Sequence, residues 1–306
     1  MKYIFYIIRK LYNKVKISFL KLILNSNNFQ LYSLRASLYA RFLTENLQLD
    51  THIKLVDSLP FFNTNNLETT TSPDYKRLMV FAPHQDDDII GCGGTILNSI
   101  KNKAEIQVTY IMDGAPPKFH GSQRTEYVNT RNIEAINVWK TINNSTPIFL
   151  ETPTRGIAID PQTVITKIQD VISKYDPDCI FVPYFLETPL DHRRSSYVIW
   201  QALQNIKHNI KQIWCYQVTT MISPNIAVDI SDVEQNKFAL MNLWESQNKL
   251  FNYAHRTRGL NAANSVYTKQ LSSLKNTPYV ELFHVLTPKE YSQLLQHHYA
   301  NTNLFG

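Results

Sequence analysis

The sequence predicts an α/β fold, with a Rossmann-like, mostly parallel sheet and helices on both faces. Along residues 77–286, apolar runs rich in β-branched residues alternate with segments of helical periodicity, which is the pattern of parallel strands joined by crossover helices. The 306 residues are 43% hydrophobic and 18% charged, so they can build one large core. The chain has no self-similar repeat of about 20 to 50 residues, which excludes solenoids and propellers.

The expected elements alternate in order along this region. Strands are expected at 77–83, 105–112, 147–150, 179–184 and 212–218, and the helices between them at 95–103, 128–142, 162–175 and 195–206. A last unit has a helix at 233–247 and a strand at 279–286, with a polar loop between them. Open α/β sheets bind ligands beyond the carboxyl ends of their strands, so the residues that follow strands are the first candidates for chemistry.

An amphipathic basic helix is expected at residues 1–24. Six basic side chains and no acidic one occur there, and most of the apolar residues fall on the opposite face of the helix. The segment lacks the run of about 18 uncharged residues that a membrane span requires, and it lacks a signal-peptide cleavage site. Two interpretations stay open. The helix lies on an anionic membrane surface, peripherally on the inner face, or it packs on the body or on a second subunit.

A second helix at 31–43 and a polar linker at 63–74 are expected next. The sequence thus divides into an N-terminal helical extension, 1–76, and a main domain, 77–306. Outside residues 1–24 the chain carries 25 basic and 25 acidic side chains, and this neutral body argues against a nucleic-acid partner. Three cysteines without a C-x-x-C pair suit a reducing compartment, which predicts a cytoplasmic protein.

A histidine and three consecutive acids follow the first expected strand. Residues 84–88 read His-Gln-Asp-Asp-Asp. Adjacent carboxylates repel one another unless a cation lies among them, and helix capping accounts for only one or two of the acids, so this run predicts a metal site. The Gly-Cys-Gly-Gly run at 91–94 fails as a dinucleotide fingerprint because Ile96 stands at the third glycine position. Its glycines are instead expected to form tight turns around the metal loop.

A further metal ligand is expected from the loop after the strand at 179–184. A catalytic zinc ion normally has three protein ligands, and this loop lies at the same edge of the sheet and ends in Asp191 and His192. His192 can bind the ion, and Asp191 can supply the carboxylate that orients its imidazole. Considered alone, His192 would be an ordinary residue at the start of a helix.

These residues resemble the signature of a known enzyme family. Residues 82–88 read Ala-Pro-His-Gln-Asp-Asp-Asp and residues 91–95 read Gly-Cys-Gly-Gly-Thr, similar to the H-P-D-D-E and G-C-G-G-T segments of the PIG-L, or LmbE-like, deacetylases. The similarity extends over about 77–286. It includes 109–114, Arg131 with Glu134, Asp191 with His192, 228–230 with Lys237, Ser246 with Gln247, and 279–283. Members of this family are metal-dependent hydrolases, usually with zinc, that remove acyl groups from amino sugars.

The resemblance implies roles for individual residues. His84, Asp87 and His192 would bind the metal and Asp86 would be the general base, with Asp88 and Asp191 in supporting positions. Gln85 and Asp88 are mild departures from the usual Pro and Glu. A larger one is Pro189, which stands where many members have the first histidine of H-x-x-H, the residue often assigned to polarise or protonate the tetrahedral intermediate.

Three residues are candidates for contact with the substrate. Arg131 can help to stabilise the oxyanion, or it can pair on its helix with Glu134. Asp113, after the second expected strand, can contact sugar hydroxyls or cap the next turn. His120 can stand in for the histidine missing at 189, or it can be a solvent-exposed loop residue.

The sequence as a whole predicts a zinc-dependent deacetylase of an N-acetylated sugar or glycoconjugate. Asp86 takes a proton from water and can return it to the leaving amine, while one divalent ion activates the water. Two alternatives stay open. The chain is a hydrolase of another acyl amide, such as an antibiotic or thiol conjugate, or it binds metal and glycan without turnover.

Overall fold

The computed structural model describes residues 67–300, except 72, 155, 159 and 269–276, together with residues 302 and 304. The chain divides into two compact units, Met1–Val56 and Asp57–Gly306, and every described residue belongs to the second. The helices expected at 1–24 and 31–43 lie outside the described residues. The boundary between residues 76 and 77 stays a prediction.

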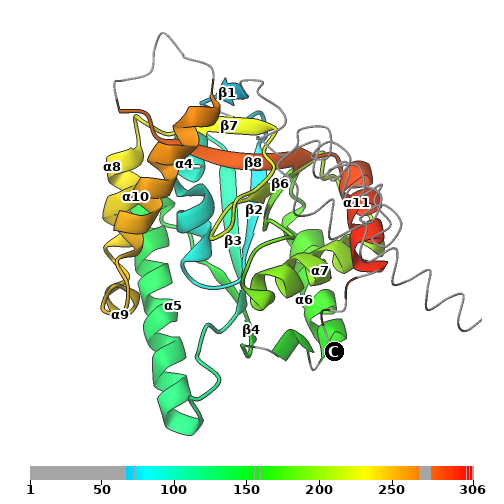
Figure 1. The fold of residues 1–306 in the computed structure, drawn as a ribbon. Helices are drawn as coiled ribbons and strands as arrows, with labels where there is room; N and C mark the ends of the chain where they lie inside the picture. Colours follow the sequence, from blue (N-terminus) through cyan, green and yellow to red (C-terminus); the bar gives the residue numbers. More distant parts are fainter. Residues whose placement is uncertain are drawn as a thin grey trace, which may run out of the picture. The chain divides into compact units, whose positions relative to one another are not determined.

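A sheet of eight strands forms the centre of this unit (Figure 1). The strands are β1 (Glu68–Thr70), β2 (Arg77–Ala82), β3 (Glu105–Met112), β4 (Ile148–Thr152), β5 (Cys179–Pro183), β6 (Gln212–Tyr216), β7 (Ile226–Asp229) and β8 (Val280–Leu286). Their order is β1-β7-β8-β6-β5-β2-β3-β4, and only β8 is antiparallel to its neighbours, β6 and β7. The predicted mostly parallel sheet is therefore confirmed.

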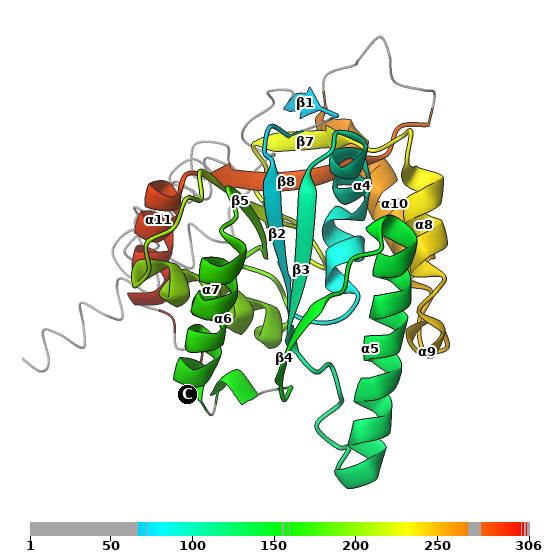
Figure 2. The same cartoon turned by 180° about the vertical axis from the view of Figure 1, so that it is seen from behind.

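Helices cover both faces of the sheet, as the sequence predicts (Figures 1 and 2). One side carries α4 (Asp87–Lys101), α5 (Gly121–Asn143), α8 (Glu234–Met241), α9 (Glu245–Asn248) and α10 (Tyr253–Asn264), and the other carries α6 (Pro161–Tyr175), α7 (Leu190–Gln204) and α11 (Pro288–Ala300). Short 3-10 turns occur at Gly156–Ala158 and Ser265–Tyr267. None of the helices in the described ranges is both long and apolar enough to span a bilayer.

The direction of the chain connections reverses beside β2. From β2 the chain passes through α4 and α5 to β3 and β4, and then returns through α6 and α7 to β5 and β6 on the other side of β2. β2 and β5 pair directly, so the loops that follow them diverge at a topological switch point. Because doubly wound sheets bind their ligands in the crevice at this point, the fold itself indicates where the site should lie.

The elements differ from the sequence predictions mainly in extent. The helix expected from residue 95 begins at Asp87, where acidic side chains favour a helix start. The helix expected at 233–247 is divided into α8 and α9, and the polar loop after it contains α10. Part of the predicted linker, Glu68–Thr70, is β1, which pairs in parallel with β7. Backbone pairing at an edge adds a strand to a sheet without any apolar pattern.

The sequence predicts that the glycines at 91–94 form tight turns around the metal loop, and this prediction is wrong. They lie inside α4 and allow it to approach the sheet closely. A Cβ atom on Gly91 would lie 2.2 Å from Cδ2 of Tyr216 on β6, and one on Gly94 would lie 2.6 Å from Cβ of Ile230. Larger side chains at these positions would push α4 away from the strands.

Candidate metal centre

Two loops at the switch point bring the predicted ligands together. His84 follows β2, Asp87 begins α4, and His192 lies in the first turn of α7, which follows β5. Five of the six residues of β2 are buried, all except Arg77 at its start, and β5 is buried along its whole length. Both loops therefore start from rigid points of the core, which is the support that a precise metal site requires.

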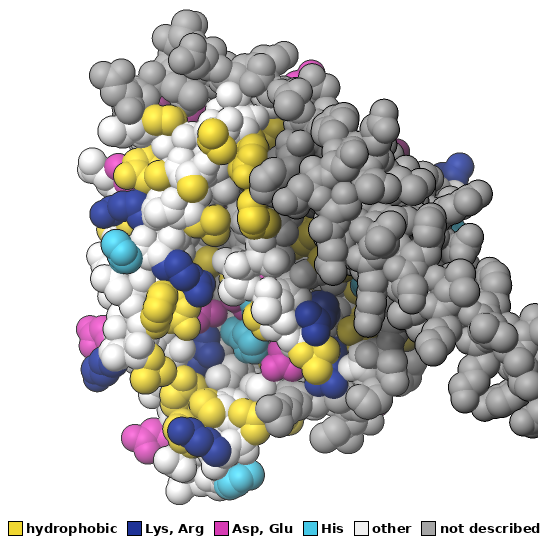
Figure 3. All heavy atoms as spheres, viewed as in Figure 1, with side chains coloured by type: hydrophobic (Ala, Val, Ile, Leu, Met, Phe, Trp, Pro, Cys, Tyr) yellow, Lys and Arg dark blue, Asp and Glu magenta, His cyan; other side chains and the backbone are white. Residues whose placement is uncertain are grey.

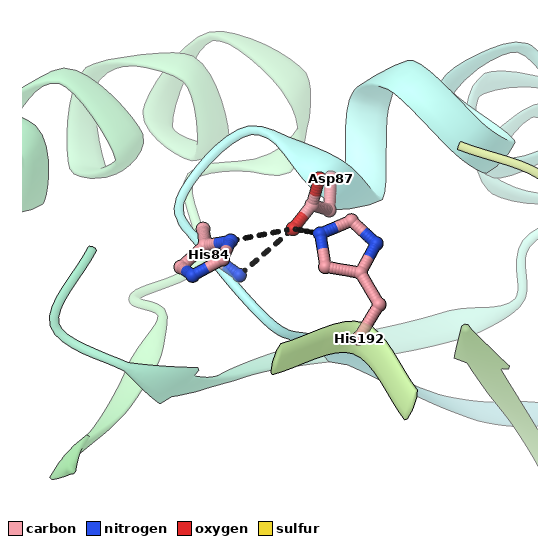
Figure 4. Close-up of side chains that lie close together, drawn as sticks. All are labelled: His84, Asp87 and His192. Atoms are coloured by element: carbon pink, nitrogen blue, oxygen red, sulfur yellow. Dashed lines mark hydrogen bonds and ion pairs between the residues drawn. The ribbon is translucent and has the colours of Figure 1, made fainter. Parts of the chain in front are cut away.

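The three side chains converge on one carboxylate oxygen (Figure 4). Oδ2 of Asp87 lies 3.2 Å from Nδ1 of His84 and 3.3 Å from Nε2 of His192. The backbone amide of His84 also donates to this oxygen, at 3.0 Å. The possible ligand atoms of the three residues all lie within 4.8 Å of one another. The structure thus brings together the three residues that the sequence selected.

The centre is buried on one side and open on the other. The side chains of Asp87 and His192 are 6% and 4% exposed, whereas that of His84 is 19% exposed. On the face seen in Figure 3, a histidine lies among acidic and basic side chains, with hydrophobic side chains around this group. Of the three side chains, that of His84 is therefore the most accessible to solvent.

Charge interactions shift the pKa values of Asp87 and His192 in opposite directions. Burial opposes ionisation of Asp87, but the two histidines outweigh it and lower the pKa of this carboxyl to about 2. Burial would lower the pKa of His192, but the carboxylates of Asp87 and Glu187 outweigh it, so the net shift is upward. Asp87 is thus held as an anion between two groups that can each carry a positive charge.

These residues fit a divalent metal ion. Two imidazole nitrogens and one carboxylate oxygen are the kind of donor set that catalytic zinc sites use, with a further position left for water. Nδ1 of His192 is buried and has no hydrogen-bond partner among the described residues, although Oε2 of Glu187 lies 3.7 Å from it. An imidazole arranged in this way presents Nε2, the nitrogen that faces Asp87, to an ion.

Asp86, the predicted base, is held by Arg131. Nη2 of Arg131 donates to Oδ2 of Asp86 at 2.8 Å, and both residues are 6% exposed. Burial raises the pKa of Asp86, and the guanidinium offsets part of this effect. Nη1 of Arg131 donates to the carbonyl of Gly114, whose φ of +69° and lack of a Cβ make room for the guanidinium. The alternative interpretation of Arg131, a pair with Glu134 on its helix, is not what the structure has: Arg131 contacts Asp86, and Glu134 accepts hydrogen bonds from N and Oγ of Ser246.

The other two candidates for substrate contact occupy different surroundings. Asp113 is 7% exposed and caps the following turn, since Oδ1 accepts a bond from the amide of Ala115. Its Oδ1 also accepts from Thr154, and its Oδ2 accepts from Nε and Nη2 of Arg124. His120 is exposed and immediately precedes α5. The substrate-binding roles of Arg131, Asp113 and His120 stay predictions.

Glu187, which the sequence analysis missed, takes the place predicted for Asp191. Its carboxylate is fully buried beside His192 and accepts hydrogen bonds from the amides of Val218 and Thr219, at 2.8 and 3.0 Å. Oδ1 of Asp191 instead lies 4.0 Å from Nη1 of Arg194. Adjacency in the sequence pointed to Asp191, but successive residues of a helix point in different directions. Only the long-range contact with the loop after β6 identifies Glu187.

Asp88 is also predicted to support the metal ligands, but its contacts lie elsewhere. Its Oδ2 accepts hydrogen bonds from the hydroxyl of Tyr110 (2.8 Å) and from Nε1 of Trp139 (2.9 Å), and the residue is fully buried. Burial raises the pKa of this carboxyl to about 7. Asp88 therefore joins α4 to β3 and α5 in the core.

The fold and the centre together define a class, namely doubly wound α/β proteins with a two-histidine, one-carboxylate centre at the switch point. Residues 79–203 match the sequence model of the PIG-L family, described as GlcNAc-PI de-N-acetylase. The resemblance deduced from the motifs is therefore confirmed over this segment.

Several solved structures share this fold. N,N′-diacetylchitobiose deacetylase from Pyrococcus horikoshii has a TM-score of 0.60 and 19% identity, over 78% of this chain and 94% of that one. The 4-carboxy-2-hydroxymuconate hydratase GalB from Pseudomonas putida has a TM-score of 0.58 and 15% identity, over 70% and 97%. A deacetylase of teicoplanin biosynthesis has a TM-score of 0.53 and 15% identity, over 69% and 98%. At these identities the similarity establishes the fold.

A curated relative from Bacteroides thetaiotaomicron, described as glucosamine-6-phosphate deaminase-like, is 43% identical over 42 residues. The matched segment is 14% of this chain and 6% of the relative's length.

Replacing Glu187 by Gln is expected to weaken zinc binding by about 10- to 100-fold, as is typical when the carboxylate partner of a ligating histidine is lost. The amide group of Gln has an NH2 in place of one carboxylate oxygen. This NH2 would face either the backbone amides of Val218 and Thr219, which are also donors, or the imidazole of His192. Competition with a chromogenic chelator measures the affinity. Asp191→Asn is the matched control and should stay within about threefold of wild type. If Asp191→Asn weakens zinc binding more than Glu187→Gln does, Asp191 is the residue that orients His192.

Proposed function

We propose that this protein is a metal-dependent hydrolase, with zinc as its ion, that removes the N-acetyl group from an amino sugar or glycoconjugate. The observation that carries the proposal is the convergence of His84 and His192 on Asp87, beside an Asp86 carboxylate held by Arg131. The match to a de-N-acetylase family and the fold shared with two deacetylases support it. Fold alone does not decide the reaction, because a hydratase shares it.

The residues divide the chemistry between them. A divalent ion held by His84, Asp87 and His192 would supply Lewis acidity, which lowers the pKa of water and polarises a carbonyl. Asp86 accepts the proton of the attacking water and delivers it to the departing amine. Arg131 keeps the Asp86 carboxylate oriented for both transfers. Position 189 is a proline at the start of α7 and offers no proton, so proton transfer is assigned to Asp86 alone.

Release of acetate tests this proposal. Protein loaded with zinc is incubated with conjugates of N-acetylglucosamine, and acetate and the free amine are both quantified. Equal amounts of both products, with their loss on chelation, are expected. Turnover only of acylated antibiotics or thiol conjugates would favour the alternative hydrolase. Binding of metal and sugar without any product would favour a binding protein.

We also propose that residues 1–24 place the enzyme on an anionic membrane surface, where a lipid-linked or membrane-proximal glycan is accessible. The six basic residues of this segment, in a chain that is otherwise neutral, support the proposal.

Deleting residues 1–24 is expected to abolish binding to vesicles that contain anionic lipid, while turnover of a small soluble substrate is unchanged. Binding of the full chain should weaken with added salt, because charges are screened beyond about 8 Å at physiological ionic strength. Co-sedimentation at several salt concentrations measures both effects. If the deleted chain binds vesicles as well as the full chain, or no longer folds, the segment packs on the body or on a second subunit.

A further inference from the structure

Helix α4, which carries the ligand Asp87, is broken in its first half. Cys92 has φ −143° and ψ 18°, and two helical segments meet there. At such a break the last carbonyls of the first segment and the first amides of the second lack partners within the helix. The break is buried, so these groups must find other partners.

Glu281 on β8 supplies the acceptors for the second segment. Its Oε1 accepts a hydrogen bond from the amide of Gly94 (2.7 Å), and its Oε2 accepts from the amide and hydroxyl of Thr95 (2.8 and 2.6 Å). These are the contacts that the side chain of an N-cap residue normally makes. Here Glu281 makes them, from a position 187 residues further along the chain than Gly94.

Lys237 on α8 supplies the donor for the first segment. Its Nζ donates to the carbonyl of Ile90 (2.9 Å), to Oε1 of Glu281 (2.7 Å) and to Oδ1 of Asn261 on α10 (2.8 Å). The side chains of Lys237 and Glu281 are both 0% exposed. All three donors of the ammonium group are therefore satisfied without water.

Burying such a pair costs free energy, and apolar side chains of similar volume often serve stability as well or better. A role in general stability is therefore a weak explanation for Lys237 and Glu281. Their contacts are instead concentrated on the two sides of the break in α4. The arrangement specifies where the helix is broken and how its two parts are joined.

We propose that Lys237 and Glu281 are positioning residues for the metal centre, an inference that rests on the proposed metal site. The segment before the break, 87–91, is too short to be a stable helix by itself. Asp88 joins this segment to β3 and α5. Ile90 joins it to the ion pair, since its carbonyl accepts from Lys237 and its amide donates to the carbonyl of Asp86 at 3.0 Å. One residue thus connects the buried ion pair to the start of the helix that carries the base and the ligand.

The test compares two variants with a control of matched stability. The double variant Lys237→Met, Glu281→Gln removes both charges and leaves no unpaired buried charge. Glu281→Gln alone keeps an amide oxygen for the donors of Gly94 and Thr95 but leaves the buried Lys237 ammonium without its counter-charge. Leu295→Ala on α11 is the control, because this fully buried residue lies on the opposite side of the sheet. All proteins are studied well below their melting temperatures, and circular dichroism verifies that they are folded.

Three measurements follow. Zinc affinity should fall by about 10-fold or more in both variants, by analogy with the loss of other groups that orient metal ligands. The visible spectrum of the Co²⁺ form, which reports ligand geometry, should change in both. In metal-free protein, amide hydrogen exchange at 86–95 should accelerate. The control should lower the melting temperature and leave all three measurements at their wild-type values.

The outcomes separate this inference from the proposed function. Folded variants with wild-type zinc affinity, Co²⁺ spectrum and hydrogen exchange would overturn it, as would a control that changes all three. If wild-type protein binds no divalent ion, the proposed metal function fails first, and hydrogen exchange still decides whether the ion pair orders the start of α4. Unchanged exchange would then overturn the inference as well.

Discussion

Replacing Asp86 by Asn is expected to reduce turnover by roughly two to four orders of magnitude and to leave the metal content unchanged. The amide retains the shape of the side chain and can still accept the hydrogen bond from Arg131, but it cannot take a proton from water. Since Asp86 is not one of the three convergent ligand residues, zinc should stay bound. Single-turnover kinetics together with elemental analysis of the same preparation measures both quantities.

Asp88→Asn is the matched control, two residues further along the same acidic run. An amide oxygen can still accept from Tyr110 and Trp139, so turnover per folded molecule should stay within about threefold of wild type. If Asp86→Asn also stays within that range, another group is the base. If Asp88→Asn instead loses turnover at unchanged stability, Asp88 acts in the centre, as the sequence suggested.

The central strands were predictable because burial on both faces leaves a clear pattern. β2, β5 and β6 are nearly continuous apolar runs, and β3 ends in one at 110–112. The positions of all four strands were predicted to within two residues. The edge strand β1 has the sequence Glu-Thr-Thr, and α10 has two Asn, two Arg and one His among its twelve residues, so neither carries an apolar pattern. Pairing and packing with distant segments determine these elements, and a local pattern cannot reveal them.

The convergence of His84, Asp87 and His192 was predictable for a related reason, since two of these residues lie close together in one motif and the third follows another central strand. The groups that hold these residues in place could not be predicted from the sequence. Arg131 and Asp86 are 45 residues apart, and Glu187 contacts backbone amides 31 to 33 residues away. In the sequence, Lys237 and Glu281 stand out only through the family resemblance, and their physical role depends on a break in α4 that no propensity predicts. Such supporting contacts depend on the folded arrangement, and no regular spacing in the sequence indicates them.

His208, at the amino edge of the sheet, offers a matched control for the proposed ligand His192. His208 lies between α7 and β6, before the start of that strand, whereas His192 follows the end of β5. His208→Ala therefore removes an imidazole from the opposite edge and should leave zinc binding unchanged. Comparing the two alanine variants separates loss of a ligand from a general effect of removing a histidine.

Replacing His192 by Ala is expected to abolish zinc binding and, with it, turnover. Wild-type protein should retain about one equivalent of zinc after loading and dialysis, because three protein ligands define a catalytic site. Without His192, two of the three proposed ligands remain, His84 and Asp87. The affinity for zinc should therefore fall by more than the roughly 10- to 100-fold that is typical when a group that orients a ligand is lost. Elemental analysis after dialysis and chelator competition measure this. Less than about half an equivalent in wild type, or an unchanged equivalent in His192→Ala, would contradict the assignment.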